Sequence, residues 1–146
     1  MKISLGCDHG AFALKEHLKE YLTRQGHRVV DCGTDSTDSC DYPIYARAAA
    51  QQVASGECER GIVLCTTGIG VSVVANKVGG VRCALCRDLL SAQLTRQHND
   101  ANMLALAGGF TGPFEAERLV DAFLGTPFEG GRHQRRVDLV METEGL

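Results

Sequence analysis

The sequence lacks any apolar run of the roughly 18 residues that a membrane-spanning helix requires, although 44% of its 146 residues are hydrophobic. It also lacks an excess of basic residues: the net charge is -3, which provides no positive field for nucleic acid. Internal repeats, low-complexity tracts and interdomain linkers are absent as well. These absences exclude a membrane protein and a general nucleic-acid binder, and we expect a single globular domain over residues 1–146.

The 7 cysteines are an odd number and do not form the pattern of a disulfide framework. Cys83 and Cys86 have the spacing of a redox or zinc motif. On a strand, however, a spacing of three residues places the two thiols on opposite faces, and the chain has no second cysteine pair with this spacing. We therefore assign no metal site. Residues 1–5 already have the composition of a strand and not of a signal peptide, so we expect a cytoplasmic protein.

Short apolar runs alternate with helical patterns along the whole chain. Leucines at positions 14, 18 and 22 recur at helical spacing, and Pro43 suits the first turn of a second helix. We expect strands over residues 2–6, 28–32, 61–65, 81–86 and 103–107. Because each strand is followed by a helix, right-handed crossovers are required, and the sequence predicts a doubly wound, Rossmann-like α/β fold with a five-stranded parallel sheet and helices on both faces.

A final helix through Arg132, Arg136 and Leu139 lies beyond the last crossover, where the sheet needs no further cover. Such an appendage docks either on a second copy of the chain or back on its own subunit. We favour a homodimer, and the two alternatives are nearly equal on sequence grounds.

The stretch from Gly61 to Lys77 is an apolar strand that leads into Cys65, a glycine-rich turn and a new helix. In a parallel sheet, ligands bind beyond the carboxyl ends of the strands, where this turn lies. The turn amides and the helix N-terminus favour a thiolate or an oxyanion, and Thr67 adds a hydroxyl. A base beside amides of Gly68 and Gly70 is suited to removing a proton next to a carbonyl group.

Purely structural roles for these residues remain open as alternatives. A cysteine after an apolar strand is as often a small buried residue, and glycines there often serve only the turn. The residues from Gly68 to Val73 lack the third glycine of a dinucleotide fingerprint, and Val71 stands where a cysteine phosphatase loop requires arginine. A nucleotide cofactor is therefore weakly supported, and the phosphatase reading fails.

Two histidines and two arginines are further candidates. His9 follows Asp8 at the end of the first strand, and His98 lies in a polar segment between a helix and an apolar strand. Each histidine alone is more often structural than catalytic. Arg132 and Arg136 are four residues apart and share a helix face, so they suit either a phosphate group or a solvated basic surface.

Six segments taken together resemble type B ribose-5-phosphate isomerases, within a wider family that includes galactose-6-phosphate and allose-6-phosphate isomerases. The match covers essentially the whole chain in order and at the right spacing. The segments are residues 6–9 (Gly-Cys-Asp-His), 41–43 (Asp-Tyr-Pro), 65–70 (Cys-Thr-Thr-Gly-Ile-Gly), 75–77 (Ala-Asn-Lys), 91–102 (Ser-Ala-Gln-Leu-Thr-Arg-Gln-His-Asn-Asp-Ala-Asn) and 129–136 (Glu-Gly-Gly-Arg-His-Gln-Arg-Arg).

The resemblance implies a cofactor-free aldose–ketose isomerase of the pentose phosphate pathway, working through an enediolate and active as a dimer whose site draws on both subunits. The resemblance is compatible with a dimer of dimers as well as a dimer, and it does not imply which subunit supplies which residue. By motif, Cys65 is the base and Thr67 exchanges protons between O1 and O2. The remaining roles are ring opening by His98 with Asp8, enediolate binding by Asn99, Gly68 and Gly70, and phosphate binding by His9, Arg132 and Arg136.

The sequence departs from the family pattern at two places. Thr66 stands where many members have glycine, and Gly108-Gly109-Phe110 stands where many place a phosphate-binding arginine. Some members use a glutamate at the position of Val71, which leaves Cys65 as the base here. The alternatives are an isomerase of a six-carbon sugar phosphate, a non-catalytic phosphosugar sensor and, last, a cysteine hydrolase.

Overall fold

The computed structural model describes all 146 residues and has one parallel sheet of five strands in the order β2-β1-β3-β5-β4. The strands alternate with helices along the chain, so each crossover returns over a face of the sheet. The predicted doubly wound fold is thereby confirmed. The strands are β1 (Lys2–Cys7), β2 (Arg28–Asp31), β3 (Arg60–Cys65), β4 (Cys83–Leu85) and β5 (Met103–Ala107).

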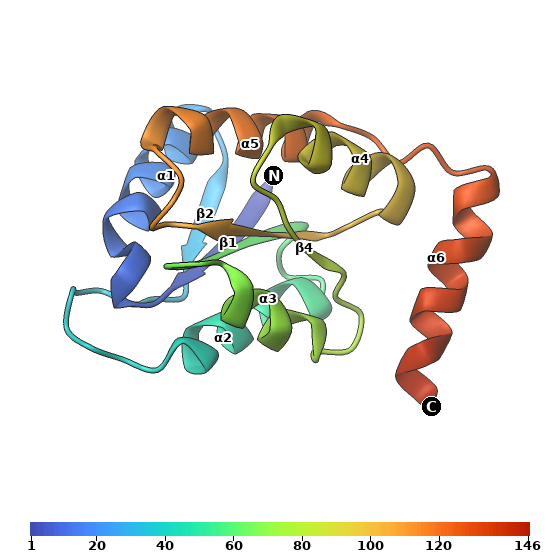
Figure 1. Cartoon of the computed structure of the whole chain (residues 1–146), viewed down its shortest axis with the longest axis horizontal. Helices are drawn as coiled ribbons and strands as arrows, with labels where there is room; N and C mark the ends of the chain where they lie inside the picture. Colours follow the sequence, from blue (N-terminus) through green and yellow to red (C-terminus); the bar gives the residue numbers. More distant parts are fainter.

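Helices cover both faces of the sheet (Figure 1). One face carries α1 (Phe12–Arg24), α4 (Leu89–Asn99) and α5 (Pro113–Gly125), and the other carries α2 (Tyr42–Ala54) and α3 (Ile69–Asn76). The last helix, α6 (Arg132–Glu142), stands at the side of this three-layered body, as Figure 1 shows in red. No helix combines the length and the apolar character needed to cross a membrane.

Each layer of helices has its own apolar core against the sheet. Leu14, Leu18 and Leu22 of α1 are buried in the same cluster as Leu5 and Leu64 of the sheet, as their spacing predicts. On the opposite face, the core is built largely from alanine and valine side chains of α2, α3, β3 and β5. These two cores fix the strands and therefore the loops at both edges of the sheet.

The fourth strand is shorter than the sequence predicts. The expected range of 81–86 contracts to Cys83–Leu85, because β4 is an edge strand whose only ladder is with β5. Cys83 packs on one core and Cys86 lies in the other, so the prediction that their thiols lie on opposite faces is confirmed. Burial raises the pKa of Cys86 to about 11 and that of Cys83 to about 12, so both thiols are protonated at neutral pH.

The turn between β3 and α3 requires glycine at position 68. Gly68 has a φ of 74°, a left-handed conformation that side chains disfavour. A Cβ atom there would lie 2.9 Å from the carbonyl carbon and oxygen of Leu106, which are backbone atoms of β5. The turn can therefore approach the neighbouring strand only because this residue has no side chain.

A buried lysine holds α1 against the end of β2. The Lys15 side chain is fully buried, and its Nζ donates to Asp31 at 2.8 and 3.0 Å and to Glu16 at 2.8 Å. Burial by itself raises the pKa of Asp31, but its hydrogen bonds with Lys15, the Gly33 amide and Lys19 outweigh that effect and lower the pKa below its usual value. The folded state therefore favours the charged Asp31.

We expect Gly68→Ala to lower the free energy of unfolding by about 2–4 kcal/mol, since it adds a backbone clash to the cost of a left-handed residue of about 1 kcal/mol. Gly56→Ala is the matched control: Gly56 has a φ of 82°, and an added Cβ there meets nothing within 4 Å. Urea denaturation of both variants separates the clash from the conformational cost. Equal losses would show that Leu106 does not constrain the turn.

We expect Asp31→Asn to destabilise the protein by about 1.5–3 kcal/mol at pH 7, as for a hydrogen bond to a charged group. Because the folded pKa of Asp31 is lowered, its contribution is present above the unfolded pKa of about 4 and is lost as the pH falls through the folded value. The difference between wild type and variant should therefore shrink below about pH 4. Lys19→Gln removes only a partly exposed bond of 3.0 Å to Asp31 and should cost less than about 1 kcal/mol. A cost equal to that of Asp31→Asn would show that the stabilisation does not come from the buried bonds between Lys15 and Asp31.

Candidate active site

Three loops meet at the carboxyl edge of the sheet around Cys65. The Asp8 amide, just after β1, donates to the carbonyl oxygen of Leu64 at 3.3 Å, and the Gly108 amide, just after β5, donates to that of Cys65 at 2.8 Å. The loop after β3 therefore lies between the other two. The sequence predicts that these strand-end loops lie together, and the structure confirms it.

Cys65 is only 6% exposed and forms the last residue of β3. Its Sγ accepts a hydrogen bond of 3.2 Å from the Gly68 amide, so a backbone dipole points at the sulfur atom. Two residues on, Thr67 Oγ1 accepts a hydrogen bond of 3.2 Å from the Ile69 amide, which leaves the threonine O–H free to donate elsewhere. A negative charge on sulfur or on a nearby oxygen would be stabilised by these groups.

Asp8 and His9 follow β1 on the same edge. The nearly buried Asp8 caps the short helical turn after it, where its Oδ1 accepts from the Gly10 amide at 3.0 Å. His9 is exposed, and its Nδ1 accepts from the Cys40 amide at 3.2 Å. A neutral His9 ring with this partner carries its proton on Nε2, which remains available as a donor to an anion.

Tyr42 is a candidate that the residue-by-residue analysis missed. Its ring lies over Gly70: a Cβ atom at position 70 would come within 2.6 to 2.9 Å of three atoms of the Tyr42 phenol, its hydroxyl oxygen included. This tyrosine begins α2 and so brings a hydroxyl to the start of α3 beside the Cys65 turn. The only signal in the sequence was its place between Asp41 and Pro43 in a segment shared with the resembled family.

Thr66, a departure from the family pattern, fills space between neighbouring loops. Its hydroxyl abuts Gly10, so an added Cβ there would overlap Thr66 Oγ1, and its methyl group lies 2.7 Å from the place of a Cβ on Gly109. Beyond it, the Arg87 guanidinium lies 5.0 Å from the centre of the Phe110 ring. Val71, where some relatives use glutamate, is fully buried in α3.

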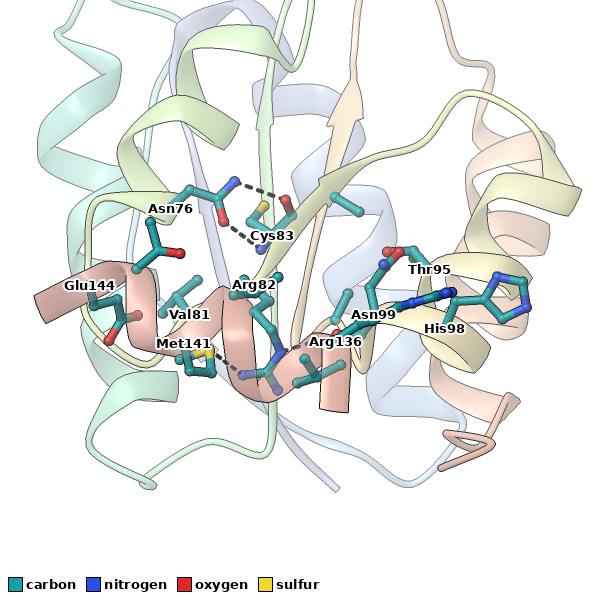
Figure 2. Close-up of a pocket in the computed structure, with 15 residues that line it drawn as sticks. Asn76, Val81, Arg82, Cys83, Thr95, His98, Asn99, Arg136, Met141 and Glu144 are labelled. Atoms are coloured by element: carbon teal, nitrogen blue, oxygen red, sulfur yellow. Dashed lines mark hydrogen bonds between the residues drawn. The ribbon is translucent and has the colours of Figure 1, made fainter. Parts of the chain in front are cut away.

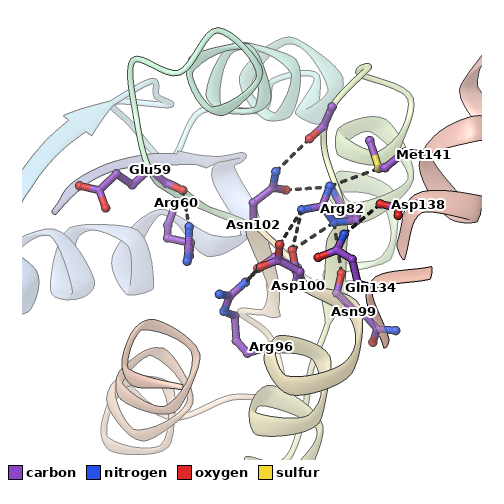
Figure 3. A network of polar contacts seen from close by, with 12 residues as sticks. Glu59, Arg60, Arg82, Arg96, Asn99, Asp100, Asn102, Gln134, Asp138 and Met141 are labelled. Atoms are coloured by element: carbon purple, nitrogen blue, oxygen red, sulfur yellow. Dashed lines mark hydrogen bonds and ion pairs between the residues drawn. The ribbon is translucent and has the colours of Figure 1, made fainter. Parts of the chain in front are cut away.

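His98 and Asn99 lie at the opposite, amino edge of the sheet. They end α4, which is closed by Asp100 in a left-handed conformation with a φ of 47°. Arg82 Nη2 donates to the carbonyl oxygen of Asp100 at 2.8 Å, and Arg96 Nη1 binds its carboxylate at 2.9 Å (Figure 3). This network fixes the end of α4 beside the first residues of β4 and β5.

One chain therefore does not bring all the predicted residues together. The Gly61 amide at the start of β3 donates to the carbonyl oxygen of Asn102, which places the segment after α4 at that end of the strand. β3 is 6 residues long, and a rise of about 3.3 Å per residue separates its two ends by roughly 17 Å. His98 and Asn99 thus lie at the amino ends of the strands, and Cys65 and Thr67 lie at the carboxyl ends.

The two predicted arginines belong to the amino-edge group. Arg132 and Arg136 are exposed on α6, in the helix whose buried residues include His133. The His133 and His98 rings are stacked with centroids 4.3 Å apart, and Glu129 Oε1 lies 3.5 Å from His98 Nε2. Burial, followed by the neighbouring His98 charge, lowers the pKa of His133. His133 and Glu129 were missed because a histidine in a basic helix gives no sign of its tertiary partner.

A groove of about 600 Å³ runs between α6 and the body of the protein (Figure 2). Val137, Val140 and Met141 of α6 line it on one side, and Val81 and Cys83 line it on the other. His98, Asn99 and Arg136 also line this groove, so polar candidates border an apolar trough. No residue of the turn from Cys65 to Gly70 lines this groove.

Comparison with known proteins gives matches over nearly the whole chain. The Ribose/Galactose Isomerase family model matches residues 3–140. Ribose-5-phosphate isomerase B of Escherichia coli is 47% identical over 98% of this chain and 96% of its own length. Galactose-6-phosphate isomerase subunit LacB of Clostridium acetobutylicum is 41% identical over 94% of this chain and 79% of its own length.

Solved structures agree with these sequence matches. Ribose-5-phosphate isomerase B of Clostridium thermocellum has a TM-score of 0.98 and 46% identity, with 99% of this chain and 98% of that chain covered. The enzyme of Mycoplasma genitalium, solved with bound ribulose-5-phosphate, has a TM-score of 0.95 and 40% identity, with 99% and 96% covered. The resemblance found in the motifs is thereby confirmed, and the chain belongs to the ribose/galactose isomerase family.

Proposed function

We propose that this chain is an aldose–ketose isomerase that interconverts D-ribose 5-phosphate and D-ribulose 5-phosphate, and that residues 1–146 act as one phosphosugar isomerase domain. The observation that carries the proposal is the position of the Cys65 thiol at the carboxyl edge. Its sulfur accepts a hydrogen bond of 3.2 Å from the Gly68 amide, and Thr67 lies two residues further on. The bound ribulose-5-phosphate of the Mycoplasma genitalium relative supports the choice of substrate.

The chemistry needs a base, an acceptor for developing charge and a route for hydroxyl protons. The Cys65 thiolate removes the proton from C2 of the open-chain aldose and returns it to C1, which passes through an enediolate. The free Thr67 hydroxyl moves a proton between O1 and O2. The Gly70 amide stabilises the enediolate from the first turn of α3, and the Gly68 amide, which donates to Cys65 Sγ in the free chain, adds its dipole at the same turn.

The remaining steps need residues from the amino edge of a second copy. His98 of the second copy, facing Asp8, moves the proton from the O1 hydroxyl to the ring oxygen and so opens the furanose. Asn99 from the same copy binds the enediolate. His9 Nε2–H of the first copy and the guanidinium groups of Arg132 and Arg136 of the second bind the phosphate, to which arginine forks donate two bonds at once.

Exposed apolar surfaces support a homodimer of this kind. Ile69 and Val73 on α3 are 56% and 51% exposed, and they belong to the helix that follows the Cys65 turn. The groove beside α6 is apolar and ends at His98 and Arg136. If α3 of one copy occupies the groove of the other, the thiol of the first copy meets the histidine and arginine of the second. Two apolar faces are buried in the same step.

A second candidate is an isomerase of a six-carbon sugar phosphate, which the similarity to the LacB subunit favours. Thr66 bears on the choice, because its side chain occupies the space between Gly10 and Gly109 at the site's edge. Turnover measured across five- and six-carbon aldose and ketose phosphates distinguishes the two. Binding of these sugars without any proton exchange would instead identify a phosphosugar sensor.

We expect Cys65→Ala to lower proton exchange at C2 of ribose 5-phosphate in deuterated water by at least about 10³-fold, within the range for loss of a general base. Substrate binding, measured by calorimetry, should change little because only proton transfer is removed. Cys32→Ser is the control, since burial raises the pKa of that thiol to about 11 and keeps it protonated. Normal exchange in the Cys65 variant would remove this residue from the mechanism.

Arg132→Gln and Arg136→Gln should each raise KM about tenfold or more, since each removes charge-assisted hydrogen bonds worth about 1.5–3 kcal/mol. Arg135→Gln removes an exposed charge from the same helix and should change KM less than about twofold. Steady-state kinetics with ribose 5-phosphate measures all three. An unchanged KM in both of the first two variants would show that α6 does not bind the phosphate.

Val73→Glu should convert the dimer to a monomer and remove turnover, because a carboxylate would have to be buried in the apolar groove. Phe114→Glu is the control: Phe114 is 70% exposed on α5, away from α3 and α6, so its variant should remain dimeric and active. Analytical ultracentrifugation and turnover of the same samples test this. A wild-type chain that sediments as a fully active monomer would contradict the shared site.

A further inference from the structure

Three potential metal ligands meet where α4 ends and α6 begins. His98 belongs to the last turn of α4, His133 to the first turn of α6, and Glu129 to the segment between α5 and α6. Their ligand atoms all lie within 4.8 Å of one another. Two imidazoles and one carboxylate are a donor set that Zn²⁺ and related transition metals bind.

The distances within this group approach those of a tetrahedral site. Bonds of about 2.0–2.1 Å from a zinc ion to three ligands place the ligand atoms about 3.3 Å apart. Glu129 Oε1 lies 3.5 Å from His98 Nε2 and 3.8 Å from His133 Nε2. Two of the three separations are therefore already within about half an ångström of the required value.

The backbone around the group is fixed, and one ring is free to adjust. The Glu129 amide donates to the carbonyl oxygen of Gln97 at 3.1 Å, and the His133 amide donates to that of Gly130 at 3.0 Å. The two rings are nearly parallel, at 14°, so one ring must turn before both Nε2 lone pairs point at one ion. The His98 side chain is 40% exposed, against 11% for His133, so His98 is the ring that turns.

We propose that His98, Glu129 and His133 bind a zinc-class divalent metal ion, with water in the remaining position, and that this ion inhibits the enzyme. The inhibition follows from the proposed function, on which this part of the inference rests: a metal bound to His98 Nε2 occupies the atom that would open the sugar ring. Metal and substrate therefore exclude each other. The metal has no role in the isomerisation itself.

The binding test uses isothermal calorimetry of the full chain with Zn²⁺ and visible spectroscopy with Co²⁺. We expect one site per chain. Glu129→Gln and His133→Gln, each made separately, should raise the Kd for the metal at least tenfold. His17→Gln is the matched control. His17 Nε2 lies 2.6 Å from Glu117 Oε2, but this histidine–carboxylate pair is not part of the group of three potential ligands. That variant should bind metal as the wild type does.

The cysteines are the competing ligands. Cys40 Sγ lies 3.8 Å from His9 Nδ1, and this pair also offers a thiol and an imidazole to a metal. A Kd that responds to Cys40→Ser and not to Glu129→Gln or His133→Gln would overturn the inference, as would a sulfur-to-cobalt charge-transfer band that Cys40→Ser removes. So would the absence of saturable binding to the wild type.

The inhibition is tested separately by turnover of ribose 5-phosphate at increasing Zn²⁺. Wild type should lose activity at the concentration that fills the calorimetric site, and added substrate should restore it. His133→Gln should require at least tenfold more metal for the same fractional loss. Metal binding without any turnover of sugar phosphates would contradict the proposed function and leave the site intact. Turnover without metal binding would contradict only the site.

Discussion

The length of the parallel sheet is the constraint on which the rest of the molecule depends. A doubly wound sheet places every strand-end loop at one edge and the end of every returning helix at the other. Cys65 ends β3 at the first edge, while His98 and Asn99 end α4 at the second, and the 6 residues of β3 span roughly 17 Å between these edges. A site that uses both groups has to be built from two copies of the chain.

The carboxyl edge provides a thiol whose surroundings are set by the backbone. Gly68 takes a left-handed conformation against Leu106, and that turn aims its own amide at the Cys65 sulfur. A side chain at position 68 would push the turn away from β5 and move the amide with it. The chemistry proposed for Cys65 thus depends on a close approach between two strands' ends, and not on a neighbouring side-chain base.

Much of the fold was predictable because its signals are local. Leu14, Leu18 and Leu22 recur at the period of a helix face, and Asp88, a residue type preferred at helix N-caps, caps α4 by accepting from the Ser91 amide at 2.7 Å. The length of β4 was not predictable, since an edge strand keeps only those residues that its single neighbour pairs. The order of the strands also depends on crossovers that leave no mark in composition.

The residues of the candidate site also divide into those with local signals in the sequence and those that depend on tertiary packing. Cys65, Thr67, Gly68 and Gly70 follow one another in the chain, so their proximity could be predicted from a single turn. The burial of His133 and its stacking on His98 depend on how α6 folds back to α4, which the basic residues around it do not reveal. The same packing places the Glu129 carboxylate beside the Nε2 atoms of both rings, where we propose that an ion binds.

The shared site is tested most directly by mixing two inactive variants, Cys65→Ala and His98→Ala. In a mixed dimer with sites made from both copies, one of the two sites regains both an intact thiol and an intact imidazole. After unfolding and refolding together in equal amounts, the mixture should recover about one quarter of wild-type turnover, because half the dimers are mixed and each has one working site. No recovery, with mixed dimers shown to be present, would contradict the account.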